Sequence, residues 1–187
     1  MRLLLHSLVA GVALAASGCR QLAESLFLVD VESEEVCLTQ RQVALPALPP
    51  GPQQLHQDFL FPLGQLGSEL PPGPMESSLR LRLFEVRVAE GEVDLSGVER
   101  AAVSLRWLES NEPIRTLAEY YRPAQPLSPT RLALQGLYPV AVPDLAREEQ
   151  VVLVLELEGQ LPHQPWQAQL QACASLWARV HYFQLVF

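Results

Sequence analysis

The 187-residue sequence contains no lysine, and all thirteen of its basic residues are arginine. It also has no glycine-rich phosphate-binding loop and no G-x-S-x-G nucleophile motif. No cysteine stands at a spacing typical of a Cys-His nucleophile or of a zinc site. These absences remove the usual sequence markers of hydrolases, nucleotide-binding enzymes and metal sites. We therefore predict a non-enzymatic protein with no catalytic residues, no metal ligands and no cofactor.

Basic clusters are also missing. Asp and Glu outnumber the arginines by 21 to 13, which gives a formal net charge of −8. A surface of this sign is a poor partner for nucleic acid or for bare anionic lipid. We therefore expect no nucleic-acid partner.

The histidines and the densest acidic run give no further site. His56, His163 and His181 are far apart in the sequence, and none has carboxylates at metal-ligand spacing. Residues 30–35 lack the ligand periodicity and the glycine of a calcium-binding loop. We interpret the histidines as surface or packed side chains, and the acidic run as a solvated turn between two strands.

The N-terminus has the three parts of an export signal. Met1 and Arg2 form a short positive start, and residues 3–16 are almost wholly apolar. This run of about 14 residues suits a signal peptide and is shorter than the roughly 20 residues of a membrane-spanning helix. The sequence Ala16-Ser17-Gly18-Cys19 follows, with three small residues before the cysteine.

This segment resembles the lipobox signal peptide of bacterial lipoproteins. The resemblance implies removal of residues 1–18, acylation of Cys19 and a lipidated tether over residues 19–25. The family usually has Leu where this chain has Ala16. Secretion with cleavage after Ala13-Leu14-Ala15 and an uncleaved membrane anchor therefore remain alternatives.

The resemblance also predicts a location. Arg20 stands where an Asp would signal retention in the inner membrane of the family's Gram-negative members. It therefore implies anchoring to the outer membrane, facing the periplasm, where the host has one. Without residues 1–18, twelve Arg stand against twenty-one Asp and Glu, a net charge near −9.

Two cysteines remain in the exported part. An even pair in an oxidising compartment favours a Cys37–Cys173 disulfide, and two free buried thiols are the alternative. Cys37 alternates with Thr39 on the polar side of its segment, and Cys173 alternates with glutamines. The bridge should therefore join the first and last parts of the chain on an outer face.

Alternating apolar and polar residues predict an all-β protein, a single β-sandwich-like domain over residues 26–187 with roughly eight to ten short strands. A slip of the alternation at Leu83-Phe84 predicts a bulge. A segment apolar on both faces, residues 151–157, predicts a central strand. The expected strands are 26–31, 36–45, 55–61, 79–88, 101–107, 114–121, 131–137, 151–157, 166–172 and 181–187.

Two segments are harder to assign. Half of the sixteen prolines fall in residues 46–74, which predicts a Pro-rich loop region around a short strand that contains Phe59 and Phe61. Residues 166–180 fit both strand and helix spacing, and we favour strand with a turn near residues 174–176. Residues 144–149 could add one helical turn.

Three functions remain open. The first is a non-enzymatic module that binds or scaffolds an envelope protein, held to the membrane by its lipid. In this reading Tyr120, Tyr121 and Arg122 could form a binding hot spot, although rings packed on the core are the plainer interpretation. The second is a carrier of an apolar ligand, which needs an interior cavity. The third is an enzyme that acts on envelope polysaccharide, which needs a cleft with converging carboxylates.

Overall fold

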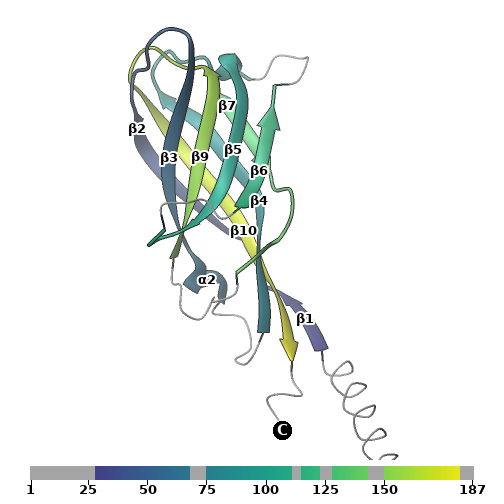
Figure 1. The fold of residues 1–187 in the computed structure, drawn as a ribbon. Coiled ribbons are helices and arrows are strands. Elements are labelled where there is room, and N and C mark those ends of the chain that lie inside the picture. The colour runs from purple at the N-terminus through teal and green to yellow at the C-terminus, as the bar shows by residue number, and fades with distance from the viewer. Residues whose placement is uncertain (1–27, 68–74, 111–114, 123–127, 143–149, 182–187) are drawn as a thin grey trace, which may run out of the picture.

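A computed structural model describes residues 28–67, 75–110, 115–122, 128–142 and 150–181. Within these residues the chain forms two antiparallel sheets that face each other as a β-sandwich (Figure 1). The predicted fold class is therefore confirmed. In chain order the elements are β1 (Leu28–Glu32), β2 (Val36–Leu45), β3 (Pro52–Pro62), α2 (Leu63–Gly67), β4 (Met75–Glu90), the 3-10 turn η1 (Leu95–Gly97), β5 (Val98–Trp107), β6 (Arg115–Tyr121), β7 (Arg131–Gln135), β8 (Val140–Ala141), β9 (Gln150–Gln160) and β10 (Trp166–His181).

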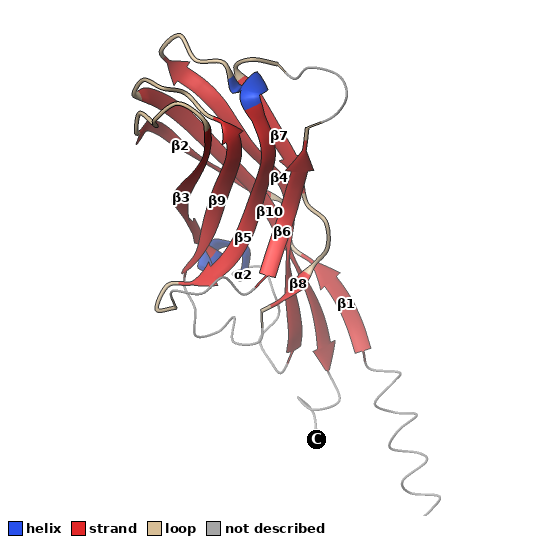
Figure 2. Ribbon diagram, turned by 45° about the horizontal axis from the view of Figure 1, so that its top comes forward, coloured by secondary structure: helices blue, strands red, loops and turns tan. Residues whose placement is uncertain are grey.

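Sheet A is built around its two longest strands, β4 and β10, which pair with each other along most of their length. Strands β1 and β2 pair with successive parts of β10 on its free side, and β7 and β8 do the same on β4. Both views show that β4 and β10 continue past the sandwich, where β1 joins them (Figure 2). The first and last described strands therefore lie side by side.

Sheet B has the order β3-β9-β5-β6. The predicted central position of residues 151–157 is confirmed, because β9 pairs with β3 on one side and with β5 on the other. Its core-facing residues are fully buried, and its other face turns Glu156 and Glu158 outward. Apolar character on both faces at the start of β9 thus indicated a strand with two neighbours.

The predicted bulge in β4 is present. Leu81 and Phe84 are both buried in the core although they are three residues apart. Arg82 is the extra residue, because Leu81 pairs with Ala174 and Leu83 pairs with Cys173. The bulge keeps apolar side chains on the core face on both sides of the slip.

Two expectations were wrong. Residues 166–181 form one continuous strand, and the turn expected near residues 174–176 is absent; a register shift at Cys173/Ala174 takes its place. Much of the Pro-rich segment is regular structure, since β3 has 11 residues and α2 follows it directly. The strand tolerates Pro52 and Pro62 because β3 is the edge of sheet B and they stand at its ends. The expected elements at 144–149 and 182–187 lie outside the described residues.

The inward side chains of both sheets form one hydrophobic core. Phe59 of sheet B and Phe84 of sheet A meet edge to face, with ring centroids 5.8 Å apart. On one side the sheets are joined through Gly136, which forms a β-bridge with Ala118 of β6. A Cβ atom added at Gly136 would lie 1.7 Å from the carbonyl oxygen of Leu81. Only glycine permits this approach. No helix among the described residues is long and apolar enough to cross a lipid bilayer.

Candidate binding face on sheet B

The cysteines lie where the sequence analysis expected them. Cys37 and Cys173 are directly opposite each other on β2 and β10, and they are joined by a disulfide. Cys37 is exposed, and Cys173 shares the outer face of sheet A with Gln171. The Glu35 carboxylate lies 3.5 Å from the Cys37 sulfur, but a disulfide sulfur carries no hydrogen and is not a free thiolate ligand. The contact is therefore neither a hydrogen bond nor a metal site.

Other residues singled out in the sequence are dispersed. Cys19 lies outside the described residues, as do the side chain of His181 and residue 182 onward. His163 lies near the β9–β10 turn, with its Nδ1 atom 3.3 Å from the Leu48 carbonyl oxygen. In the acidic run, Asp30 and Glu32 form ion pairs with Arg179 and Arg82 within sheet A. The run is therefore part of strand β1 and the turn after it.

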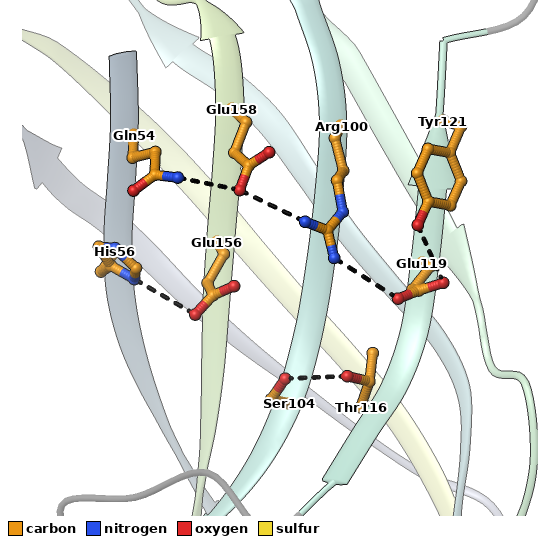
Figure 3. Close-up of polar contacts among 9 residues, drawn as sticks. All are labelled: Gln54, His56, Arg100, Ser104, Thr116, Glu119, Tyr121, Glu156 and Glu158. Carbon is orange, nitrogen blue, oxygen red and sulfur yellow. Dashed lines mark hydrogen bonds and ion pairs between the residues drawn. The ribbon is translucent and has the colours of Figure 1, made fainter.

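Side chains that are far apart in the sequence form a row across the outer face of sheet B. Strand pairing aligns Gln54, Glu158, Arg100 and Tyr121 on β3, β9, β5 and β6. The Gln54 amide donates to Glu158 at 3.1 Å, and Arg100 donates to the same carboxylate oxygen at 3.4 Å (Figure 3). One set of polar contacts thus crosses three strands and continues to the fourth.

A second row of aligned residues lies directly beside the first. His56, Glu156, Ala102 and Glu119 are aligned by the same pairing. His56 lies 3.5 Å from the Glu156 carboxylate, and Glu119 lies 3.7 Å from the Arg100 guanidinium (Figure 3). The two rows together define the polar face of sheet B.

The floor of this face is small and well packed. Ala102 is 3% exposed and Ser104 is 6% exposed, although both point away from the core. The Ser104 and Thr116 hydroxyl oxygens are 3.5 Å apart (Figure 3). Longer side chains of the two rows stand on either side of these small residues, and they are held by a rigid four-stranded sheet.

Tyr120 and Tyr121 differ: one ring packs on the core, and the other is exposed as a hot-spot residue would be. Tyr120 packs against the core, and burial raises the pKa of its hydroxyl group. Tyr121 is 61% exposed on the polar face, where the Arg100 guanidinium lies 5.8 Å from its ring centroid and Glu119 accepts its hydroxyl hydrogen. A partly exposed arginine beside an exposed tyrosine is the type of pair enriched at binding hot spots.

One end of the polar face borders an open hollow, whose lining includes Gln54, Glu158 and Glu99. Three hollows lined by described residues, of about 640, 520 and 560 Å³, open at the surface. The smallest lies beside β3 with Leu60, Leu108 and Val152 in its wall. None of these three is the interior cavity that a carrier of an apolar ligand needs, and the arrangement suits surface recognition.

The sequence analysis missed this face. Tyr121 was singled out as part of a possible hot spot, but Gln54, Arg100 and Glu119 gave no signal. Their contacts depend on the register of four strands drawn from residues 52–160, which one sequence does not reveal.

No known protein-family model matches the chain, and no curated protein matches it. Several solved structures are distantly similar. The decameric BFDV capsid protein is 9% identical, with a TM-score of 0.33, over 81% of this chain and 98% of that one. A nora virus structure is 15% identical, with a TM-score of 0.37, over 82% and 60%. A carbohydrate-binding module of the β-sandwich superfamily is 6% identical, with a TM-score of 0.30, over 77% and 54%. Likenesses this distant concern the sandwich architecture and carry no information on function.

Proposed function

We propose that the protein is a lipid-anchored, non-enzymatic binding module of the bacterial cell envelope, which holds another envelope protein against the polar face of sheet B. The observation that carries the proposal is the row Gln54–Glu158–Arg100–Tyr121, in which each side chain is positioned by its neighbours before any partner arrives. Prior ordering reduces the entropy that binding costs.

The chemistry of the face favours a basic partner segment. Arg100 pairs with Glu158 and Glu119, and Glu156 lies beside His56, so the two rows hold three carboxylates and one guanidinium group. Complementary charge steers association and selects against acidic partners. Arg100 and Tyr121 would supply most of the affinity, since a few Arg and aromatic residues usually dominate an interface.

The sequence supports the anchor. In the lipoprotein interpretation Cys19 carries the acyl chains, and Leu28 lies nine positions further along the chain. Nine steps of extended chain reach at most about 30 Å. The domain would therefore work close to its membrane, here proposed to be the outer membrane on its periplasmic side.

Replacing Cys19 tests the anchor. A Cys19→Ser chain expressed in a Gram-negative host should incorporate no labelled palmitate and should leave the membrane fraction, because it lacks the acylated thiol. The unmodified chain processed in parallel is the control. A Cys19→Ser chain that is still labelled and membrane-bound would refute the lipoprotein assignment.

Site-specific photocrosslinking tests the partner. A crosslinking amino acid at Thr116, on the polar face, should capture a specific envelope protein in intact cells, whereas one at Gln135, on the outer face of sheet A, should not. Arg100→Ala and Tyr121→Ala should each weaken that complex by about 2 kcal/mol, roughly thirtyfold, and the exposed Arg80→Ala is the matched control. Repeated recovery of no specific protein from Thr116, or equal capture from both positions, would contradict the proposal.

A further inference from the structure

The outer face of sheet A beyond the disulfide has a different chemistry. Gln169 on β10, Arg87 on β4 and Arg131 on β7 are aligned in one row across three strands. Arg41 lies at the free side of this row, because the β2–β10 register skips past Gln169 between Gln40 and Val43. We call the row Arg41–Gln169–Arg87–Arg131 the arginine row.

A buried carboxylate organises this row. Arg87 and Arg131 stand directly opposite each other, an arrangement that like charges destabilise unless something lies between them. Glu85 takes that position. One of its oxygens pairs with Arg87, and the other accepts a hydrogen bond from Arg131 Nε at 2.6 Å and lies 2.5 Å from Arg131 Nη2. The Glu85 side chain is 2% exposed, whereas each arginine is 52% exposed. Two guanidinium groups are thus fixed side by side by one carboxylate, which leaves a surplus positive charge facing solvent.

Glu85 is held in its ionised form. Burial by itself raises the pKa of Glu85, but hydrogen bonds and charges from Arg87 and Arg131 outweigh it, and the resulting pKa lies below the usual 4.5. The ion pairs of Glu85 with Arg87 and Arg131, which we call the Glu85 clamp, therefore persist throughout the neutral pH range.

Amide side chains flank the arginines. Gln167, Gln169 and Gln171 alternate along the outward side of β10, each partly exposed. A guanidinium group binds a carboxylate or phosphate through paired N–H donors, and an amide can both donate to and accept from a hydroxyl group. This combination matches a polymer that carries acidic groups and hydroxyl groups at regular intervals, namely an acidic polysaccharide.

The acidic surface of the chain does not prevent such binding. The carboxylates of the polar face lie on the far side of the sandwich, farther from the arginine row than the spacing of about 10 Å between packed sheets. Physiological salt, with a Debye length of about 8 Å, weakens the interaction of solvent-exposed charges at such separations. The acidic side chains near the row are Glu85, whose negative charge is balanced by its arginine partners, and Glu90 at the end of β4 beside Gln167. An anionic lipid surface fits less well, because interfacial binding uses inserted apolar side chains. The exposed large apolar residues of the described chain are Leu28, Val29, Leu60, Leu108, Tyr121, Leu137 and Tyr138, which lie outside the arginine row.

We propose that the arginine row binds an acidic polysaccharide, with Arg87 and Arg131 holding a carboxylate or phosphate group and the glutamines of β10 holding neighbouring hydroxyl groups. This site is separate from the polar face of sheet B and does not depend on the protein partner proposed above. The protein would then connect an envelope protein on one sheet with an envelope glycan on the other.

Affinity electrophoresis of the purified full-length chain in mild detergent tests this proposal. Polygalacturonate in the gel should retard the chain, and its fully methyl-esterified form, which keeps the sugar but loses the charge, should not. Arg87→Gln and Arg41→Gln should each weaken binding roughly tenfold by removing charged donors. Arg115→Gln, an exposed arginine at the start of β6, is the charge-matched control and should bind as the unmodified chain does.

Arg41→Gln protects the test against misfolding. Arg41 is exposed and has no carboxylate partner among the described residues, so its removal leaves the Glu85 clamp intact. Thermal unfolding identifies any variant that fails to fold. Absence of retardation, equal retardation by the esterified polymer, unchanged binding of folded Arg41→Gln, or preference for phosphatidylglycerol vesicles over polygalacturonate would each overturn the proposal.

Discussion

Removal of the Cys37–Cys173 disulfide should cost much of the stability of the domain. The bridge joins residues 136 apart in sequence, so it closes a loop that covers most of the folded chain. For a loop of this length the chain-entropy relation gives about 5 kcal/mol of stabilisation, because the bond restricts the unfolded state. In a domain of this size about 5 kcal/mol corresponds to a fall of about 10–20 °C in the unfolding midpoint.

The assay is urea unfolding of the Cys37→Ala/Cys173→Ala double variant beside the unmodified chain, each with and without reductant. Reductant should destabilise only the unmodified chain, to the level of the double variant. The dependence of the unfolding free energy on urea should also steepen, because the unbridged unfolded chain exposes more surface. A double variant within about 1 kcal/mol of the unmodified chain would refute the entropic reasoning and show that strand pairing alone holds β2 on β10.

Three further outcomes follow from the packing and the charges. Glu85→Gln should destabilise the domain by about 1–3 kcal/mol at neutral pH, since it removes charge-assisted hydrogen bonds to two arginines. Because the folded pKa of Glu85 lies below 4.5, this stabilisation is complete above that pH and is lost as the pH falls through the folded value. The unfolding free energies of the unmodified chain and the variant should therefore converge in acid. A constant difference down to pH 2 would contradict the ionised state assigned to Glu85. Gly136→Ala should cost about 3 kcal/mol or more in urea unfolding, because its Cβ would meet the Leu81 carbonyl oxygen, and an unchanged midpoint would be evidence against that approach. Phe84→Ala should cost about 3–5 kcal/mol in the same assay through the cavity left beside Phe59, whereas a loss under 1 kcal/mol would mean that the core collapses into the space.

Local sequence was informative wherever burial imposes a period of two. Residues 36–45 were expected as a strand and form β2 with those bounds. The bulge near Leu83 could be expected because a slip in the alternation must be absorbed locally if apolar side chains are to stay in the core. The C-terminal segment was harder, because Leu170, Cys173 and Trp177 fit a helical face as well as a strand; the pairing of β10 with β1, β2 and β4 decided between them.

Function was less accessible from the sequence, since each candidate site is assembled across strands. Gln54 and Glu158 are 104 residues apart, and Arg131 and Glu85 are 46 apart. Their alignment follows from strand order and register, which depend on how all the strands pack together.

The sequence by itself determined the all-β class and the outer-face position of Cys37 and Cys173, and it predicts an export signal with Cys19 as the lipid site. These features depend on residues that are close together in the sequence, so the sequence alone is enough to predict them. Only the tertiary structure decided that Glu119, Glu156 and Glu158 gather with Arg100 on sheet B while Arg41, Arg87 and Arg131 lie together on sheet A. Composition gave only a net negative charge, whereas the pairing of distant strands determines which charged side chains become neighbours.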